Sequence, residues 1–163
     1  MGHIQQIIFV CTGNTCRSPM AESLYISMEF GKDIKASSRG LVVLFPEPLN
    51  PKAETVLKTH GLELNNHTAK QLKDNEINET TLVLTMTQNQ KTTLLKEYCV
   101  NREHCFTLKE FVGETGDVVD PYGGSLMDYE ECFSELARLV RKMAYRIEKE
   151  NIGAGMNDGH KKG

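Results

Sequence analysis

Apolar runs typical of buried strands alternate with amphipathic segments along most of this 163-residue chain. One continuous apolar run closes residues 4–10 and another spans 81–86, which is typical of strands covered on both faces of a parallel sheet. Weaker strands are predicted over 33–39 and 105–108. Because parallel strands are joined through helices, this alternation predicts an α/β fold with a parallel sheet.

Four helices are predicted between and after these strands. The first takes Ser18 as its N-cap, reaches about Phe30 and ends at Gly31. The second spans about 51–60, between an asparagine cap and a glycine, and the third spans 88–97.

The last helix has the clearest periodicity. Apolar residues recur at helical spacing from about Asp128 to Glu150, after a glycine-rich loop over 113–125. Residues 151–163 carry four glycines and few apolar groups, which predicts a disordered tail. We therefore expect one domain over residues 1–150, followed by this tail.

Composition narrows the class of protein. The formal net charge is −3 and the basic residues are scattered, so a nucleic-acid binder is not expected. No apolar run approaches the ~18 residues of a membrane span, and no signal peptide is recognisable. An odd count of five cysteines, without a Cys-x-x-Cys pair, argues against a disulfide framework and a zinc site. We expect a cytoplasmic monomer that uses no metal and no other cofactor.

The segment from Cys11 to Ser18 joins the first buried strand to the first helix. Ligands of open α/β sheets bind at the carboxyl ends of strands, and a helix N-terminus there offers N–H groups to an anion. Arg17 adds a planar fork that matches phosphate oxygens, and Cys11 would face the phosphorus as a thiolate nucleophile. The other candidate phosphate-binding residues of this loop are Thr12, Gly13, Asn14, Thr15, Cys16 and Ser18.

The spacing Cys-x5-Arg carries little information by itself, since roughly 0.2 matches are expected by chance at this composition. Cys132 and Arg138 have the same spacing, but they lie inside the predicted last helix with no strand before them. The pair Cys11 and Arg17 has a buried strand before it, Gly13 within it and a helix after it. The setting, and not the spacing, predicts a phosphate site.

A leaving group expelled from phosphorus needs a proton, so a positioned carboxylic acid is expected near this loop. Asp120 is the candidate, because the following proline restricts its backbone, and Tyr122 is a candidate wall of the substrate pocket. On composition alone, a turn residue before proline is the better interpretation of Asp120. Helix capping or simple solvation is the better interpretation of Asp117.

The motif Cys-x4-Cys-Arg-Ser after the first strand, with Asp-Pro-Tyr at 120–122, resembles the low-molecular-weight protein tyrosine phosphatase family. This resemblance implies a flavodoxin-like three-layer sandwich with a four-stranded parallel sheet. It also implies hydrolysis through a phosphocysteine intermediate, in which Cys11 is the nucleophile, Arg17 the phosphate clamp and Asp120 the general acid and then base.

The same resemblance implies supporting roles around the loop. Asn14 would hold the shape of the loop, Ser18 would steady the thiolate through its hydroxyl, and His67 would be structural. Arg39 stands where the family more often has a small residue, and it could bring a positive charge near the entrance of the site.

Three stretches, 8–23, 106–110 and 117–125, resemble the bacterial protein arginine phosphatases within this family. The arginine-directed members resemble this chain in having threonine at Thr15, where tyrosine-directed members usually carry isoleucine. A shorter side chain with a hydroxyl makes room for a planar guanidinium, which Asp120 could hold by paired hydrogen bonds. We therefore expect phosphorylated proteins as partners, with phosphoarginine as the substrate group and phosphotyrosine as the alternative.

Two functions of other kinds stay open. A thioredoxin-coupled arsenate reductase would need further cysteines after the third strand, where residues 85–90 contain none. A non-catalytic phosphate-binding module would tolerate loss of the Cys11 thiol. For Cys16 two interpretations stand side by side: a small packing residue, or a redox partner that traps oxidised Cys11 as a disulfide.

Overall fold

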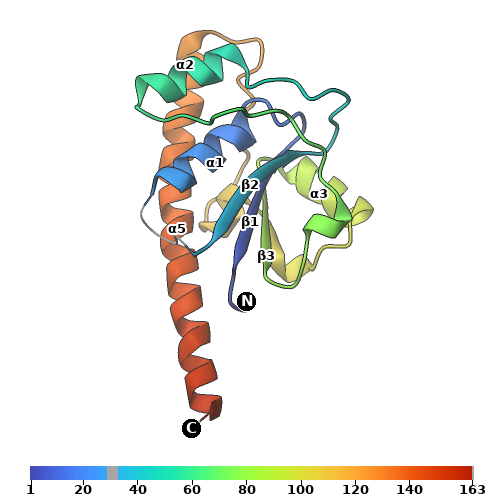
Figure 1. Cartoon of the computed structure of the whole chain (residues 1–163), viewed down its shortest axis with the longest axis vertical. Helices are drawn as coiled ribbons and strands as arrows, with labels where there is room; N and C mark the ends of the chain where they lie inside the picture. Colours follow the sequence, from blue (N-terminus) through green and yellow to red (C-terminus); the bar gives the residue numbers. More distant parts are fainter. Residues whose placement is uncertain (29–32, 163) are drawn as a thin grey trace.

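The computed structural model describes residues 1–28 and 33–162, with side chains described as far as residue 154. Within these ranges the chain forms a four-stranded parallel sheet between two layers of helices (Figure 1). The strands, in the spatial order β2-β1-β3-β4, are β1 (Gln6–Cys11), β2 (Lys35–Gly40), β3 (Thr81–Thr85) and β4 (Cys105–Thr107). The predicted three-layer sandwich with a four-stranded parallel sheet is confirmed.

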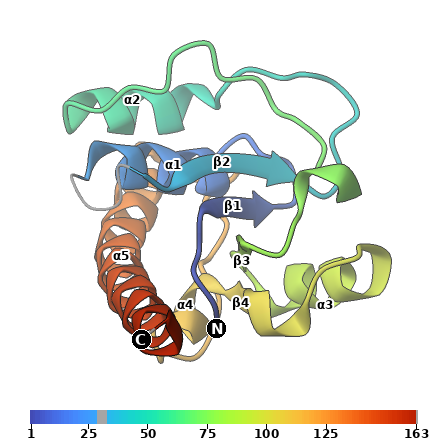
Figure 2. The ribbon, with the colours of Figure 1, turned by 60° about the horizontal axis from the view of Figure 1, so that its bottom comes forward.

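Helices cover the two faces of the sheet unequally. One layer holds most of the helices and the other is built around α3, as the turned view in Figure 2 shows. The helices are α1 (Arg17–Ser27), α2 (Pro51–Thr59), α3 (Gln88–Glu97), α4 (Leu108–Phe111) and α5 (Leu126–Lys162), with short 3₁₀ turns η1 (Asp74–Glu76) and η2 (Arg102–His104). None of the helices in the described part of the chain is long and apolar enough to cross a membrane.

The apolar run of β1 reflects its position at the centre of the sheet. Successive side chains of a strand point to opposite faces. Ile7 and Phe9 enter the larger core with α1, α2 and α5, whereas Ile8 and Val10 enter the smaller core with α3. All four are fully buried. The carboxyl end of β1 is therefore a rigid base for the residues that follow it.

Two helix boundaries on the first layer differ from the prediction. α1 begins at Arg17 with Cys16 as its N-cap, and it ends at Ser27. The prediction of Ser18 as N-cap is wrong, because its hydroxyl is engaged by side chains of the preceding loop. The predicted end at Phe30 and Gly31 lies outside the described residues. The second and third helices and the loop over 113–125 lie where the sequence predicts them.

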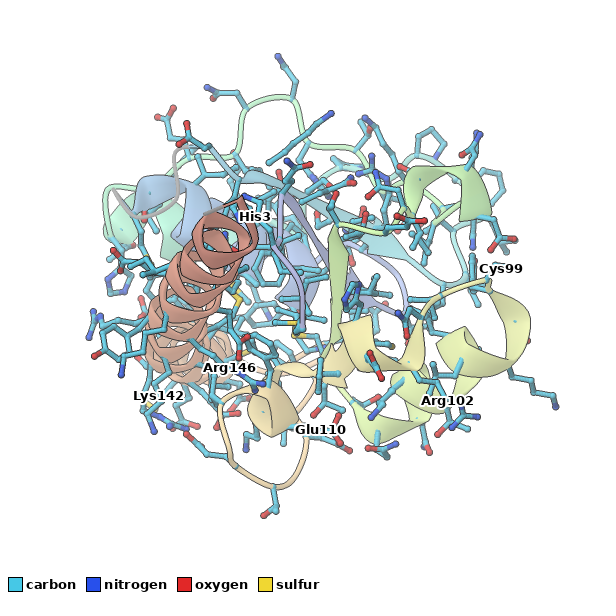
Figure 3. All side chains as sticks on the ribbon, turned by 90° about the horizontal axis from the view of Figure 1, so that it is seen from below. His3, Cys99, Arg102, Glu110, Lys142 and Arg146 are labelled. Carbon is cyan, nitrogen blue, oxygen red and sulfur yellow. The ribbon has the colours of Figure 1, made fainter. Side chains whose placement is uncertain are left out.

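Helix α5 continues through the segment 151–162, where the sequence predicts a disordered tail. The Asn151 side chain accepts a hydrogen bond from the Ile4 main-chain N–H (2.8 Å) and donates one to the Ile4 carbonyl (3.0 Å). Earlier in the same helix, the Arg146 guanidinium donates to the main-chain carbonyl of Phe111 (Arg146 is labelled in Figure 3). The same guanidinium lies 4.1 Å from the centroid of the Phe111 ring. The helix thus contacts the body beyond the predicted boundary at residue 150.

Candidate active site

The loop between β1 and α1 is held from outside by main-chain hydrogen bonds. The N–H groups of Leu41, Val42 and Asn50 donate to the carbonyls of residues 11, 12 and 15, at 3.1, 3.0 and 3.0 Å. In a planar trans peptide the C=O and the next N–H point to opposite sides. The N–H groups of residues 12, 13 and 16 therefore point away from these outer segments, which is the arrangement that an anion-binding nest requires.

Asn14 is the centre of the loop's internal framework. Its φ of +58° lies in the left-handed region, which asparagine tolerates better than most residues. The fully buried side chain donates to the hydroxyls of Ser18 (2.9 Å) and Ser38 (3.0 Å) and accepts from the Lys70 N–H (3.0 Å). The main-chain carbonyl oxygen of Asn14 lies 2.8 Å from Nε2 of His67. These contacts join the loop at Asn14 to β2 and to the segment 67–70.

Strand β2 contributes residues that sequence reasoning missed. The Ser38 hydroxyl donates to the Glu22 carboxylate at 2.6 Å, so the chain of polar contacts from Asn14 ends on a charged acceptor. Gly40 lies so close to the loop that a Cβ there would meet the Thr12 carbonyl oxygen at 2.9 Å. Only glycine fits at such a distance. A glycine ending a strand beside the loop is the one sequence signal that could have pointed to this contact.

Cys11 lies at the end of β1 with its sulfur among hydrogen-bond donors. The Asn14 N–H donates to Cys11 Sγ at 3.3 Å, and Ser18 Oγ lies 2.9 Å from the same sulfur. The Asn14 amide nitrogen can only donate, so Ser18 Oγ accepts there and its own proton is free to point at the sulfur. The loop thus places the Asn14 N–H and the Ser18 hydroxyl against the sulfur of Cys11.

Arg17 opens α1 and is almost fully buried, with 6% of its surface exposed. Its Nη1 donates to the Val118 carbonyl at 2.9 Å, and its Nη2 lies 3.6 Å from Oδ2 of Asp120. A guanidinium has five N–H donors, so these contacts fix the plane of the group and leave donors for a phosphate. The structure thus brings Arg17 and Asp120 together, although they are far apart in the sequence.

Asp120 lies in the loop between α4 and α5, with its side chain 53% exposed. Its Oδ1 accepts from the Tyr122 N–H at 3.0 Å, which holds the carboxylate towards Arg17. The Tyr122 side chain is exposed. Asp117, in the same loop, accepts from the Gln88 N–H at 2.9 Å. That contact caps the start of α3 and confirms the capping interpretation.

The two threonines of the loop face different neighbours. Thr12 Oγ1 accepts from the Gln90 side-chain amide at 3.2 Å, which ties the loop to α3. Thr15 is half-buried, and its hydroxyl lies 3.8 Å from Cys16 Sγ. Thr15 also lines a surface groove together with Gly13. Both threonines are reachable from outside, since Thr12 is exposed and Thr15 half-buried, but only the Thr12 hydroxyl is tied to α3.

Cys16, in the last part of the loop, is buried, and its sulfur lies 3.7 Å from the hydroxyl of Tyr129 on α5. Burial raises the pKa of Cys16, and the hydrogen bonds from Tyr129 and Thr15 partly oppose that rise. Cys11 and Cys16 are both free thiols in this structure. The contact between Cys16 and Tyr129 was not foreseen, because no local signal in the sequence of α5 points to it.

Arg39 does not bring a free charge to the entrance. Its Nε donates to Glu76 at 2.7 Å and its Nη1 donates to the Ser38 carbonyl at 2.7 Å.

Across residues 1–28 and 33–154, no three His, Cys, Asp or Glu side chains gather in a way that could hold a metal ion. Arg17 and the N–H groups of the loop are positive groups that the structure places at the site.

Comparisons with known proteins agree with this geometry. The model of the family "low molecular weight phosphotyrosine protein phosphatase" matches residues 6–152. A low molecular weight protein-tyrosine-phosphatase, PtpB of Staphylococcus haemolyticus, is 41% identical over 138 residues, which cover 85% of this chain and 96% of that protein. The protein-arginine-phosphatase of Bacillus subtilis is 39% identical over 147 residues, covering 88% and 97%. The solved structure of the YwlE arginine phosphatase from Geobacillus stearothermophilus has a TM-score of 0.84 at 36% identity, covering 91% and 96%.

Proposed function

The chain belongs to the low molecular weight phosphotyrosine protein phosphatase family, and we propose that within it the protein hydrolyses phosphoarginine residues of other proteins. The observation that carries this choice is the half-buried Thr15 hydroxyl, which lies next to Cys16 on a loop that also holds Cys11. The resemblance of Thr15 to the arginine-directed members, and the similarity to two protein arginine phosphatases, support it.

In the first step the Cys11 thiolate attacks the phosphorus. The bond between phosphorus and the guanidinium nitrogen breaks, and its electron pair stays on that nitrogen, which receives a proton from Asp120. Arg17 and the inward N–H groups of the loop hold the phosphate oxygens as their charge redistributes. The products of this step are a phosphocysteine at Cys11 and a free arginine side chain.

In the second step the Asp120 carboxylate takes a proton from water, and the resulting hydroxide attacks the phosphocysteine. The bond between sulfur and phosphorus breaks, inorganic phosphate leaves, and the Cys11 thiolate is restored. The half-exposed carboxylate of Asp120, held near Arg17, suits both steps because water and substrate can reach it. No metal is part of this mechanism, since Arg17 and the loop supply the positive charge.

Selectivity would come from Thr15 and Asp120 together. A phosphoarginine puts a planar, polar group close to the phosphorus, where Asp120 can accept paired hydrogen bonds from it. Isoleucine at Thr15 would add apolar bulk there and remove the hydroxyl. The exposed Tyr122, followed by Gly123 instead of a second aromatic residue, leaves a more open wall than a phosphotyrosine ring would favour.

The test compares kcat/KM on phosphoarginine and phosphotyrosine peptides of the same sequence, for the wild type and Thr15→Ile. We expect the preference to move towards phosphotyrosine by about tenfold or more, because one hydrogen-bonding group and its surroundings typically change discrimination by that much. Thr59→Ile, at an exposed threonine on α2, is the matched control and should keep the wild-type ratio. An unchanged ratio in Thr15→Ile would remove the role given to Thr15.

We also propose that Cys16 protects Cys11 from irreversible oxidation by forming a disulfide with it. Hydrogen peroxide oxidises the Cys11 thiolate to a sulfenic acid and releases hydroxide; the Cys16 thiol then attacks the oxidised sulfur, forming a disulfide and water. Support comes from the position of Cys16 on the same loop as Cys11. After peroxide treatment, thiols should restore the wild type but not Cys16→Ser. Failure to find the disulfide by mass spectrometry would end this part of the proposal.

An arsenate reductase is less well supported. The disulfide would have to pass from the loop to a later cysteine, and Cys105 is buried in the smaller core, where burial raises its pKa to about 11. Such a thiol is a poor nucleophile at neutral pH.

We also propose a monomer that works in the cytoplasm, where thiols such as Cys11 stay reduced.

A further inference from the structure

Three exposed apolar side chains gather beside the loop that begins at Cys11. Among the described residues, ten large hydrophobic side chains are exposed, and three of them, Val42, Leu44 and Phe45, follow β2 directly. Leu44 is 83% exposed and Phe45 70% exposed. Exposed apolar groups that gather in one place mark binding surfaces more often than scattered ones do.

These side chains form one wall of a groove that continues from the segment Cys11–Ser18, called here the phosphate loop. The groove has a volume of about 310 Å³, and its lining residues are Gly13, Thr15, Val42, Val43, Leu44, Phe45 and Glu47. Gly13 and Thr15 belong to the loop that begins at Cys11. A ligand in the groove would therefore lie directly beside a phosphate bound in the loop.

The groove is held in place by the same contacts that hold the loop. The Val42 N–H donates to the Thr12 carbonyl, and the Val43 N–H donates to the Gln71 side-chain oxygen at 2.8 Å. The Glu47 N–H closes a turn onto the Phe45 carbonyl at 2.8 Å. These hydrogen bonds fix the main chain of the groove, while the apolar side chains of Leu44 and Phe45 remain exposed. The groove is therefore a preformed binding site.

We propose that this groove, called here the 42–47 groove, binds an apolar side chain of the substrate protein next to its phosphorylated residue. The proposal rests on the proposed phosphatase function, since it places a neighbour of the phosphorylated residue. Consecutive Cα atoms are about 3.8 Å apart, so a residue one or two positions away can reach a groove that shares its wall with the phosphate loop. Glu47 is the only charged residue of the lining, so most of the contact surface is apolar.

The experiment measures kcat/KM for phosphate release from phosphoarginine peptides that differ only at the residue beside the phosphoarginine: leucine, serine or lysine. We expect the leucine peptide to exceed the serine peptide by about tenfold, because partial burial of a leucine side chain contributes on that scale. This ratio should fall towards one in Leu44→Ser and in Phe45→Ser. Tyr145→Ser, at an exposed apolar residue on α5, is the matched control and should keep the wild-type ratio.

Equal rates for leucine and serine in the wild type would overturn the proposal, as would a ratio that survives in both groove variants. A lysine peptide that reacts faster than the leucine peptide would assign the selectivity to Glu47 and would also overturn it. If Phe45→Ser changes the oligomeric state in light scattering and leaves the ratio unchanged, the surface joins two copies of this chain instead. The same series with phosphotyrosine separates the two proposals: a leucine preference found only there keeps the groove and rejects phosphoarginine as substrate.

Discussion

Cys11 and Arg17 are separated by the same number of residues as Cys132 and Arg138, yet the two pairs are built in opposite ways. Both cysteines are buried, with 3% and 8% of their surfaces exposed. The sulfur of Cys11 lies among donors at the end of a strand. Cys132 lies on α5, where burial raises the pKa of its thiol to about 12.

The two arginines differ just as clearly. Arg17 is buried and its guanidinium is held by a main-chain carbonyl and by Asp120. Arg138 is half-exposed and pairs with Glu114 at 2.6 Å. Six positions along an α-helix turn through about 600°, so two such side chains point about 120° apart. A loop that turns back on itself can bring the same positions to one ligand, which a straight helix cannot.

The largest expected difference between the pairs lies in the cysteines. Cys11→Ser should lower kcat by at least ~10⁴-fold, because a hydroxyl in the same place is a far weaker nucleophile than a thiolate. Cys132→Ser should leave kcat within about twofold and reduce stability slightly, since a polar group replaces a small buried thiol. Hydrolysis of p-nitrophenyl phosphate measures both variants. Comparable losses in the two variants would contradict the distinction drawn between them.

The arginines should differ next. Arg17→Lys should lower kcat/KM by about 10²- to 10³-fold, because a point charge cannot replace the planar fork that grips two oxygens. Arg138→Lys keeps the charge beside Glu114 and should leave kcat/KM unchanged. The same assay, with circular dichroism to check folding, tests the pair. A phosphate clamp at Arg17 is excluded if the lysine variant retains full activity.

The third position after each cysteine offers a smaller contrast, between Asn14 and Glu135. Asn14→Ala leaves the buried partners Ser18 and Ser38 without their donor, which should lower the free energy of unfolding by about 2–4 kcal/mol and kcat/KM by about tenfold. Glu135→Ala removes only a surface contact with Lys109 and should change either quantity little. Denaturant titration gives the first quantity. If both variants are equally stable, the loop is not framed by Asn14.

The smallest effect concerns Glu114, the partner of Arg138. Hydrogen bonds from Arg138 and Lys142 lower the pKa of Glu114 from its ordinary 4.5 to about 2. A lowered carboxyl pKa adds stability that is fully present above pH 4.5 and is lost as the pH falls towards 2. Glu114→Gln should thus be slightly less stable than the wild type at pH 7, with the difference vanishing near pH 2 and in high salt. A pH-independent difference would show that charge is not its cause.

The sequence predicts those parts of the molecule whose signal is local. The apolar runs of β1 and β3 and the Asn50 cap of α2 were all recognisable because each depends on neighbouring residues. The polar chain through Ser38 and Glu22 was missed, since it joins a weak strand to a helix across the loop. These contacts join residues that are distant in the sequence, and the hydrophobic periodicity of the chain does not predict such contacts.

The wrong prediction at Ser18 and the missed helix α4 also come from the limits of local sequence signals. Ser18 has the composition of a helix cap, but a tertiary contact with Cys11 and Asn14 takes its hydroxyl. The α4 helix is a single turn over Leu108–Phe111, too short to give a periodic pattern. Thr15 and Asp120 were proposed as site residues mainly by resemblance to a family, because single residues in loops carry no pattern of their own.

Asn151 does for Ile4 what a neighbouring strand would do, accepting from its N–H and donating to its carbonyl. A helix side chain thereby acts as a one-residue extension of the sheet, at the opposite end of β1 from Cys11. The strand that ends at Cys11 is consequently anchored at both ends, and its first residues are protected from fraying. A chain shortened to residues 1–150 would lose this anchor, and amide hydrogen exchange at Ile4 would report the loss before any change reached the loop that begins at Cys11.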